Sequence, residues 1–147
     1  MATTSTTHVA AQLRLAITRT SRRLRQEAGV GLSPSQGAAL ASIERHGPLT
    51  PSEVASIERI QRPTATRLLA KLEAAGLVVR HADPVDRRSS LVSVTAAGRS
   101  LLAESRAHKD AFLAQCLRAL GAEDRATLAR AAELLEELLT LEDGERR

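Results

Sequence analysis

Four charged side chains, Asp83, Asp86, Arg87 and Arg88, lie close together within RHADPVDRRSSLVSVT (residues 80–95), between two apolar runs. The apolar runs, LVV before the charges and LVSV after them, have strand character, which predicts a hairpin with a loop over residues 82–89. Half of that loop, fully extended, would reach roughly 13 Å beyond the strands. An arginine on such an arm can enter the minor groove of DNA, where the potential is negative, or contact a phosphate.

The charged residues of this predicted loop suggest different roles. Asp83 and Pro84 are typical of a turn. Asp86 lies two residues before Arg88, so its carboxylate can orient that guanidinium. The alternative is an exposed tip whose charges pair with one another and contribute little energy. The residues of the loop leave both interpretations open.

A second group of candidate DNA-binding residues begins at Pro63. The apolar residues Ala65, Leu68, Leu69, Leu72 and Ala75 recur at helical spacing and predict a buried stripe. With that stripe facing inward, the outward face and its flanks carry Pro63, Thr64, Thr66, Arg67, Ala70 and Lys71. Arginine can bind guanine through two hydrogen bonds, and threonine can contact thymine or phosphate, so this face suits a major groove. An ordinary solvated helix surface is the alternative.

The beginning of the same helix offers further hydrogen-bond donors. Its unpaired N–H groups and positive dipole end attract phosphate, and Gln61 and Arg62 lie at this position. Thr50 and Ser52, at the start of the preceding helix, can bind a phosphate in the same way. A simple capping role is the favoured interpretation of these two residues.

Helix boundaries can be read from capping residues. Ser33 and Thr50 each precede a proline, and Gln36 or Glu53 follows three residues after the cap, which makes two capping boxes. Gly76 is expected to end the candidate DNA-binding helix. These signals and the apolar spacing predict helices over residues 8–28, 34–45, 51–57, 63–75, 95–120 and 123–141. Two short helices followed by a hairpin are the pattern of a helix-turn-helix with a wing.

The whole chain of 147 residues is expected to form one domain, mainly α with a small β-hairpin wing. Residues 1–7 are predicted to be a disordered leader, residues 32–95 a winged helix-turn-helix, and residues 8–28 and 96–141 helices outside that unit. In the last helix, apolar residues recur with near-heptad spacing at Leu128, Ala131, Ala132, Leu135, Leu138 and Leu139. This stripe requires a partner.

Composition narrows the class of nucleic acid. Residues 58–90 hold seven Lys or Arg against four acids, in a chain whose net charge is +4. The chain has one Phe and no Tyr or Trp, so it lacks the aromatic rings on which single-stranded bases usually stack. Duplex DNA is therefore the expected partner.

Other kinds of chemistry are poorly represented. Cys116 is the only cysteine, which excludes an intrachain disulfide and a cysteine-based metal cluster and fits a reducing cytoplasm. The four histidines lack close metal-ligand spacing, and no catalytic Ser/His/Asp arrangement or phosphate loop stands out. No apolar run is long enough to span a membrane. Residues 1–26, rich in Arg and free of acids, faintly resemble a transit peptide but continue into a predicted helix.

Residues 49–102 resemble the MarR family of bacterial winged helix-turn-helix regulators. The motifs that carry the resemblance are LT..EVA, T.TRLLAKLE..GLV.R, DP.DRR and V.VT..G, in the family's order and spacing. The helical flanks fit as well, so the resemblance covers nearly the whole chain. It implies a DNA-binding transcriptional regulator, most often a repressor, whose first helix and last two helices interlock in a homodimer.

The resemblance also implies roles for single residues. The helix over residues 63–75 corresponds to the recognition helix. Asp86 and Arg88 correspond to the family's wing pair, in which the Arg enters the minor groove and the Asp braces it, while Arg87 occupies a more variable position that faces phosphate. A ligand pocket between the dimer helices and the winged unit is implied too. Peroxide-sensing members have a reactive Cys in the first helix, which this chain lacks, and Cys116 is interpreted as a small buried hydrophobe.

We therefore predict a sequence-specific regulator, not an enzyme, that binds double-stranded DNA as a homodimer on a pseudo-palindromic operator in the cytoplasm. It is expected to need no cofactor and to respond to a small-molecule effector of unknown identity. A winged-helix module for protein contacts or scaffolding, without specific DNA binding, is the alternative. The predicted DNA contacts are Ser52, Gln61, Arg62, Pro63, Thr64, Thr66, Arg67, Lys71, Asp86, Arg87 and Arg88.

Overall fold

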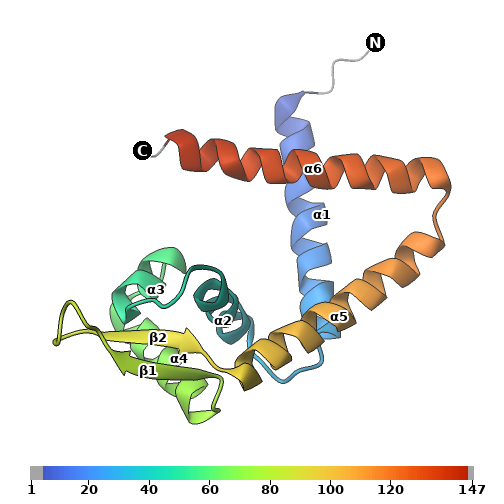
Figure 1. Ribbon diagram of the computed structural model, residues 1–147. Helices are drawn as coiled ribbons and strands as arrows, with labels where there is room; N and C mark the ends of the chain where they lie inside the picture. Colours follow the sequence, from blue (N-terminus) through green and yellow to red (C-terminus); the bar gives the residue numbers. More distant parts are fainter. Residues whose placement is uncertain (1–4, 146–147) are drawn as a thin grey trace. The chain divides into compact units, whose positions relative to one another are not determined.

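The computed structural model describes residues 5–145, with side chains as far as Leu141 (Figure 1). Its elements are α1 (Thr6–Glu27), α2 (Pro34–His46), α3 (Pro51–Ile57), α4 (Arg62–Ala74), β1 (Val78–Ala82), β2 (Ser90–Val94), α5 (Ala96–Arg118) and α6 (Ala122–Glu145). The predicted fold class, mainly α with a small antiparallel hairpin, is confirmed. Within the described residues, no helix has the length and apolar content needed to cross a membrane.

The chain divides into two compact units, Met1–Lys109 and Asp110–Arg147, with the boundary inside α5. The first unit holds α1 to α4, the hairpin and the beginning of α5. The second unit holds the rest of α5 and α6. All the predicted DNA contacts therefore belong to the first unit.

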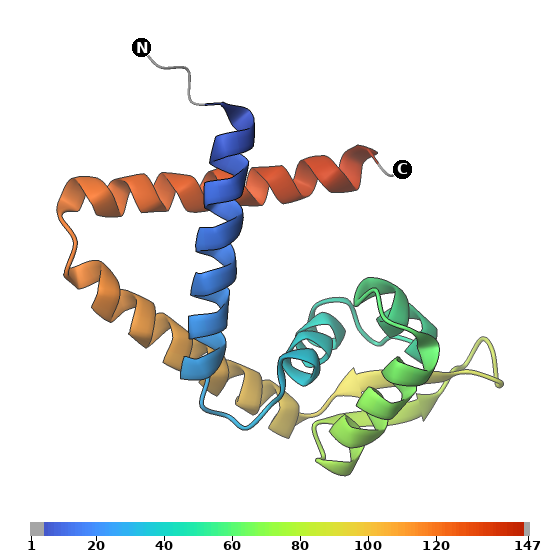
Figure 2. The same cartoon turned by 180° about the vertical axis from the view of Figure 1, so that it is seen from behind.

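The core of the first unit joins α4 to the hairpin and to α2. Leu40 of α2, Leu69 and Leu72 of α4, and Val92 of β2 are fully buried. They share one apolar cluster with Leu102 of α5. Figure 2 shows α4 against the hairpin, in agreement with the contacts between α4 and β1. Because burial of each such side chain contributes about 1.5–3 kcal/mol, this cluster fixes the positions of α4 and the hairpin relative to one another.

Both predicted capping boxes are present. Ser33 Oγ accepts a hydrogen bond from Gln36 N at 3.2 Å, and Gln36 Oε1 accepts one from Ser33 N at 2.9 Å. In the second box, Thr50 Oγ1 accepts from Glu53 N at 3.2 Å, and Glu53 Oε2 accepts from Thr50 N at 2.7 Å. These bonds satisfy backbone donors where α2 and α3 begin, as the sequence pattern predicts.

The two strands of the hairpin pair antiparallel, and Leu49 adds a short bridge to β2. Arg80 of β1 lies opposite Val92 of β2, and residues 83–89 form the loop, which begins one residue later than predicted. Leu49, just before α3, donates from its N to Val92 O at 3.1 Å and accepts from Val92 N at 2.7 Å. Backbone hydrogen bonds therefore join the hairpin to the helix-turn-helix, in addition to the shared core.

Several helix ends differ from the sequence-based expectation. α1 begins at Thr6 rather than at residue 8, so the predicted leader was drawn too long; residues 1–4 of that leader lie outside the described part of the chain. Ala75 is an exposed C-cap rather than a member of the buried stripe. α6 extends to Glu145. Thr6 and Ala75 are exposed, so apolar spacing does not report these two helix ends.

Gly98, in the first turn of α5, tests how closely the base of the hairpin is packed. A methyl group there would overlap the Leu77 carbonyl oxygen and lie 2.7 Å from Val94 Cγ1. Gly98→Ala should therefore lower the free energy of unfolding by about 1–3 kcal/mol, measured by urea denaturation at fixed protein concentration.

Gly37→Ala is the matched control, because a methyl group at Gly37 meets nothing within 4 Å. Helix propensity should raise the free energy of unfolding of that variant by up to about 1 kcal/mol. Equal stability of the two variants would contradict the packing at Gly98.

Candidate nucleic-acid interface

The outward face of α4 presents the side chains that the sequence predicts there. The exposed residues are Gln61, Arg62, Pro63, Thr64, Thr66, Arg67, Ala70 and Lys71. Thr66 Oγ1 donates to Arg62 O at 3.0 Å, and Arg67 Nε donates to Pro63 O at 3.4 Å, so both side chains lie back along the helix. Within the described residues, the terminal nitrogens of Arg67 have no partner and remain available to a ligand.

Ser52 and Arg62 contact each other between the starts of two helices. Arg62 Nη2 donates to Ser52 Oγ at 2.6 Å, which joins the beginning of α3 to the beginning of α4. The interpretation of Ser52 as a cap is wrong, because Thr50 caps α3 and Ser52 Oγ accepts from Arg62 instead. The pair sits where the sequence predicts phosphate contacts for both residues.

Thr64, Arg67 and Lys71 line an open groove between α4 and the beginning of α2. The groove has a volume of about 550 Å³, and no acidic side chain lines it. Ser35 of α2 lines it as well. Nothing in the sequence pattern points to Ser35, because only the packing of α2 against α4 brings the two helix faces together.

Hydrogen bonds to the backbone order the wing tip. Asp83 Oδ1 accepts from Val85 N at 2.9 Å, which makes the turn predicted at Asp83. Asp86 Oδ1 accepts from Arg88 N at 3.0 Å, and Ser89 N donates to Asp86 O at 3.0 Å. Two aspartates thus hold the loop that carries the arginines.

Asp86 positions Arg88 through its main chain and not through its guanidinium, which corrects the sequence-based interpretation. Within the part of the chain that the structure describes, neither Arg87 nor Arg88 forms an ion pair. The alternative of a tip whose charges pair with one another is therefore wrong for this conformation. Two consecutive exposed guanidinium groups remain free to meet an anion.

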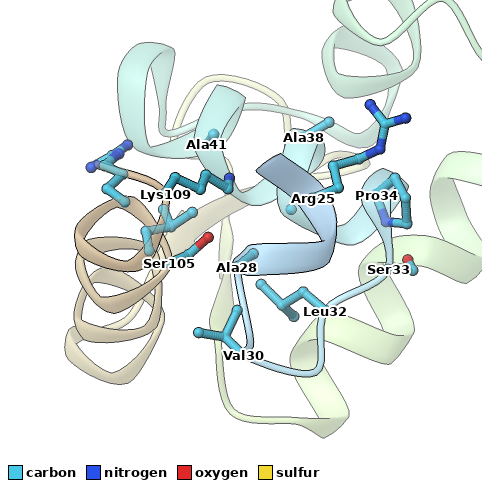
Figure 3. Close-up of a pocket in the computed structure, with 13 residues that line it drawn as sticks. Arg25, Ala28, Val30, Leu32, Ser33, Pro34, Ala38, Ala41, Ser105 and Lys109 are labelled. Carbon is cyan, nitrogen blue, oxygen red and sulfur yellow. The ribbon is translucent and has the colours of Figure 1, made fainter. Parts of the chain in front are cut away.

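A smaller cavity of about 190 Å³ lies in the first unit between α1, the loop after it, α2 and α5 (Figure 3). Its apolar lining includes Val30, Leu32 and Leu102, and its cationic lining consists of Arg25, Arg106 and Lys109. No acidic residue lines it. Arg106 Nη2 also donates to Glu44 Oε2 of α2 at 2.5 Å. The cavity therefore combines apolar walls with an excess of positive charge.

The cysteine and the histidines offer no comparable site. Cys116 is exposed, so its interpretation as a buried hydrophobe is wrong. His108 contacts main chain, with its Nδ1 2.9 Å from Ala28 O. Among the described residues, no three His, Cys, Asp or Glu side chains gather as a metal site requires.

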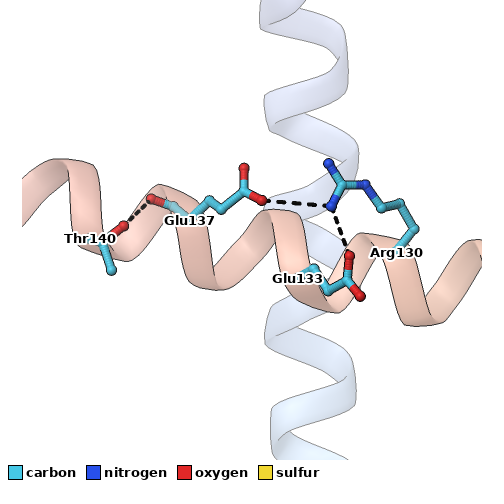
Figure 4. A network of polar contacts seen from close by, with 4 residues as sticks. All are labelled: Arg130, Glu133, Glu137 and Thr140. Atoms are coloured by element: carbon cyan, nitrogen blue, oxygen red, sulfur yellow. Dashed lines mark hydrogen bonds and ion pairs between the residues drawn. The ribbon is translucent and has the colours of Figure 1, made fainter.

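Both terminal helices expose large apolar side chains. On α1 these are Val9, Leu13, Leu15 and Ile17, and on α6 they are Leu128, Leu134, Leu138, Leu139 and Leu141. The charges of α6 are partly satisfied within the helix, since Arg130 Nη1 lies 2.7 Å from Glu133 Oε2 and 3.6 Å from Glu137 Oε1 (Figure 4). Large exposed apolar surfaces of this kind are typical of interfaces between proteins.

Known proteins resemble this chain over most of its length. A sequence model described as MarR family matches residues 30–89. An uncharacterized HTH-type transcriptional regulator of Mycobacterium leprae is 36% identical over 136 residues, which cover 92% of this chain and 95% of the relative. The HTH-type transcriptional repressor MdtR of Bacillus subtilis is 37% identical over 112 residues, or 70% of this chain and 71% of the relative. A solved Pseudomonas aeruginosa protein superimposes with a TM-score of 0.79 and 40% identity, over 90% of this chain and 94% of that protein.

Asp86→Ala tests whether this carboxylate orders the wing tip. Loss of the acceptor for Arg88 N should speed exchange of that amide about fivefold, because one such hydrogen bond contributes about 1 kcal/mol. Amide hydrogen exchange of the free protein, followed by NMR, measures the effect. The Val85 amide, which bonds to Asp83, is the internal control. An unchanged rate at Arg88 would show that the tip is ordered by other contacts.

Proposed function

The chain belongs to the MarR family of transcriptional regulators, and we propose that it binds double-stranded DNA sequence-specifically, as a homodimer that represses transcription until a small molecule binds. Membership confirms the resemblance found in residues 49–102 and the expectation of a regulator rather than an enzyme. One observation carries the proposal: α4 and the wing are held on a single core, and each presents arginines without an ion-pair partner in the described residues.

α4 is proposed to enter the major groove. The free terminal nitrogens of Arg67 suit a guanine edge, and the threonines beside it suit thymine or phosphate. Ala70 is small and exposed, so it permits close approach to the bases. Gln61 and Arg62 at the helix start, with Ser52 next to Arg62, are proposed to bind the phosphates at the edge of the groove. Contacts to bases and contacts to phosphates would then come from different parts of one helix.

The wing is proposed to bind the neighbouring minor groove. Arg88 inserts into the groove, Arg87 faces phosphate, and Asp86 holds the loop in shape through the Arg88 amide. Because backbone hydrogen bonds already order the tip, binding would immobilise little more than the two arginine side chains. Lys71, on the flank of α4, adds a further phosphate contact.

A second copy of the chain is the proposed partner of the terminal helices, residues 8–28 and 96–141. The exposed leucines of α6 and the apolar residues of α1 would be covered in such a dimer. A twofold axis would present two α4 helices, so the operator should be pseudo-palindromic with half-sites about one helical turn apart.

The cavity lined by Arg25 and Lys109 is the proposed effector site. Its apolar walls and excess cations suit a small molecule that carries a negative charge. Arg106 lies both at this cavity and on Glu44 of α2, so an anion that attracts its guanidinium would weaken a contact between α5 and α2. Repression is proposed because MdtR, a relative, is a transcriptional repressor. The protein is proposed to work in the cytoplasm, where its DNA target lies.

Binding to duplex DNA at several salt concentrations tests the proposal against the alternative of a protein-interaction module. A duplex selected from random sequence should bind in fluorescence anisotropy with log K falling by about 0.9 per phosphate contact for each decade of salt. Single-stranded DNA of the same sequence should bind more weakly, because stacking side chains are scarce. Affinity independent of salt, or no affinity for duplex, would favour the protein-interaction module.

Arg67→Ala and Arg88→Ala separate the two proposed contacts in the same assay. Arg67→Ala should reduce discrimination between selected and random duplex by about 1–3 kcal/mol if it contacts a base. Arg88→Ala should weaken binding while the melting temperature stays near that of the wild type, because the Arg88 side chain is exposed and forms no ion pair in the described residues. If Arg67→Ala loses the same affinity for both duplexes, Arg67 contacts a phosphate rather than a base. If Arg88→Ala binds with unchanged affinity, Arg88 of the wing does not contact DNA.

A further inference from the structure

Arg59, in the turn between α3 and α4, has an unusual backbone conformation. Its φ is 52°, and it is the one non-glycine residue with positive φ in the described part of the chain. In this left-handed region the Cβ atom crowds the backbone carbonyl, so residues other than Gly, Asn and Asp are rare there. A long cationic side chain at this position therefore calls for a physical reason.

The backbone around Arg59 forms the hydrogen-bond pattern of a Schellman motif that ends α3. Arg59 N donates to Ser56 O at 3.2 Å, and Ile60 N donates to Ala55 O at 3.0 Å. Ile60 packs against the apolar core. The motif places Arg59 at the position after the helix cap, which glycine most often occupies. The turn thus needs the left-handed backbone but does not need a side chain.

The end of α4 shows that such a turn forms without a side chain at the left-handed position. Gly76 has φ 72°, its N donates to Glu73 O at 2.9 Å, and Leu77 N donates to Leu72 O at 2.9 Å. Leu77, like Ile60, packs into the core. The chain therefore builds the same helix ending twice, once with glycine and once with arginine at the left-handed position.

No polar contact of the Arg59 side chain within the described residues offsets the cost of its backbone conformation. It is exposed, and within the described residues it forms no hydrogen bond or ion pair. The neighbouring carboxylate of Glu58 accepts from Ser42 Oγ instead. The Arg59 guanidinium is therefore free. What Arg59 adds, compared with the glycine at the corresponding position after α4, is a cation at the surface.

We propose that Arg59 binds a DNA phosphate beside the groove that α4 enters. The inference rests on the proposed function, and Arg59 adds to the contacts expected from the sequence. Arg59 stands two residues before Gln61, so their Cα atoms are at most about 8 Å apart and its guanidinium reaches the phosphates next to the helix start. The hydrogen-bonded turn holds the Arg59 backbone in place, so only the side chain loses freedom on contact. Such a contact positions the protein without selecting a sequence.

Arg59→Gly separates binding from folding because it should lower the affinity for DNA without lowering the stability of the fold. Glycine relieves the left-handed backbone, so the melting temperature should stay the same or rise by up to about 4 °C. Affinity for selected and random duplex should fall by a similar factor, about tenfold, as expected for a charge-assisted hydrogen bond. The salt dependence of log K should become shallower by about one unit for each protomer. A residue with a purely structural role would not lower affinity while stability is kept.

Three further variants serve as controls. Arg59→Asn also removes the charge in a residue that tolerates the left-handed region, and should repeat the loss. Arg59→Lys keeps a cation and should recover most of the affinity. Arg45→Gln neutralises another exposed arginine of the same unit that has no ion pair in the described residues, and measures the general effect of one lost charge.

The outcomes distinguish this inference from the proposed function. If wild-type protein binds duplex and Arg59→Gly binds as well as Arg45→Gln, the role of Arg59 is wrong and the proposed function stands. If wild-type protein does not bind duplex, both are wrong. A loss confined to the selected duplex would also overturn the inference, because it would make Arg59 a base contact.

Discussion

Burial of Leu72 of α4 in one apolar cluster with Val78 and Val92 of the hairpin is the constraint on which the interface depends. Neither α4 nor a two-stranded hairpin is expected to be stable alone in water. Packed together, and joined by the backbone bridge between Leu49 and Val92, they form one unit. Loss of a buried methylene here would disturb the placement of the proposed DNA contacts, which lie outside the core. The stability of the fold and the geometry of the interface therefore have the same physical source.

The ion pairs distinguish arginines that join elements of the fold from arginines at the candidate interface. Arg80 of β1 is paired with Glu73 of α4, and Arg106 of α5 with Glu44 of α2, so each pair joins two elements. In the part of the chain that the structure describes, no carboxylate pairs with Arg67, Arg87 or Arg88. An unpaired guanidinium on the surface loses little hydration before binding and keeps its full charge for a phosphate or a base edge. The pairs of Arg80 and Arg106 join elements of the fold, whereas the unpaired arginines are the proposed contacts to a polyanion.

Local signals in the sequence were sufficient for much of the fold. The Ser33 and Thr50 capping boxes depend on residues three positions apart, and the hairpin depends on two short apolar runs, so both could be predicted. The face of α4 could be predicted because helical spacing fixes which side chains share a side. The resemblance to the MarR family supported the prediction that these elements form a winged helix-turn-helix.

Features that depend on tertiary contacts could not be predicted in this way. The Arg62–Ser52 hydrogen bond requires the crossing of α3 and α4, and Ser35 reaches the groove only through the packing of α2 against α4. The left-handed turn at Arg59 was hidden because its sequence lacks the glycine that usually marks such a turn. Cys116 is a different case: a small apolar side chain suggests burial, but whether a helix position is covered depends on tertiary contacts, and Cys116 is exposed.

Hydroxyl-radical footprinting on a selected duplex tests most directly whether α4 and the wing act as one DNA-binding unit in each protomer. The proposed arrangement predicts two symmetric patches of protected sugars, about one helical turn apart, each extending into the minor groove next to the bound major groove. Footprints of wild-type protein with unprotected minor grooves, or with one patch only, would contradict it.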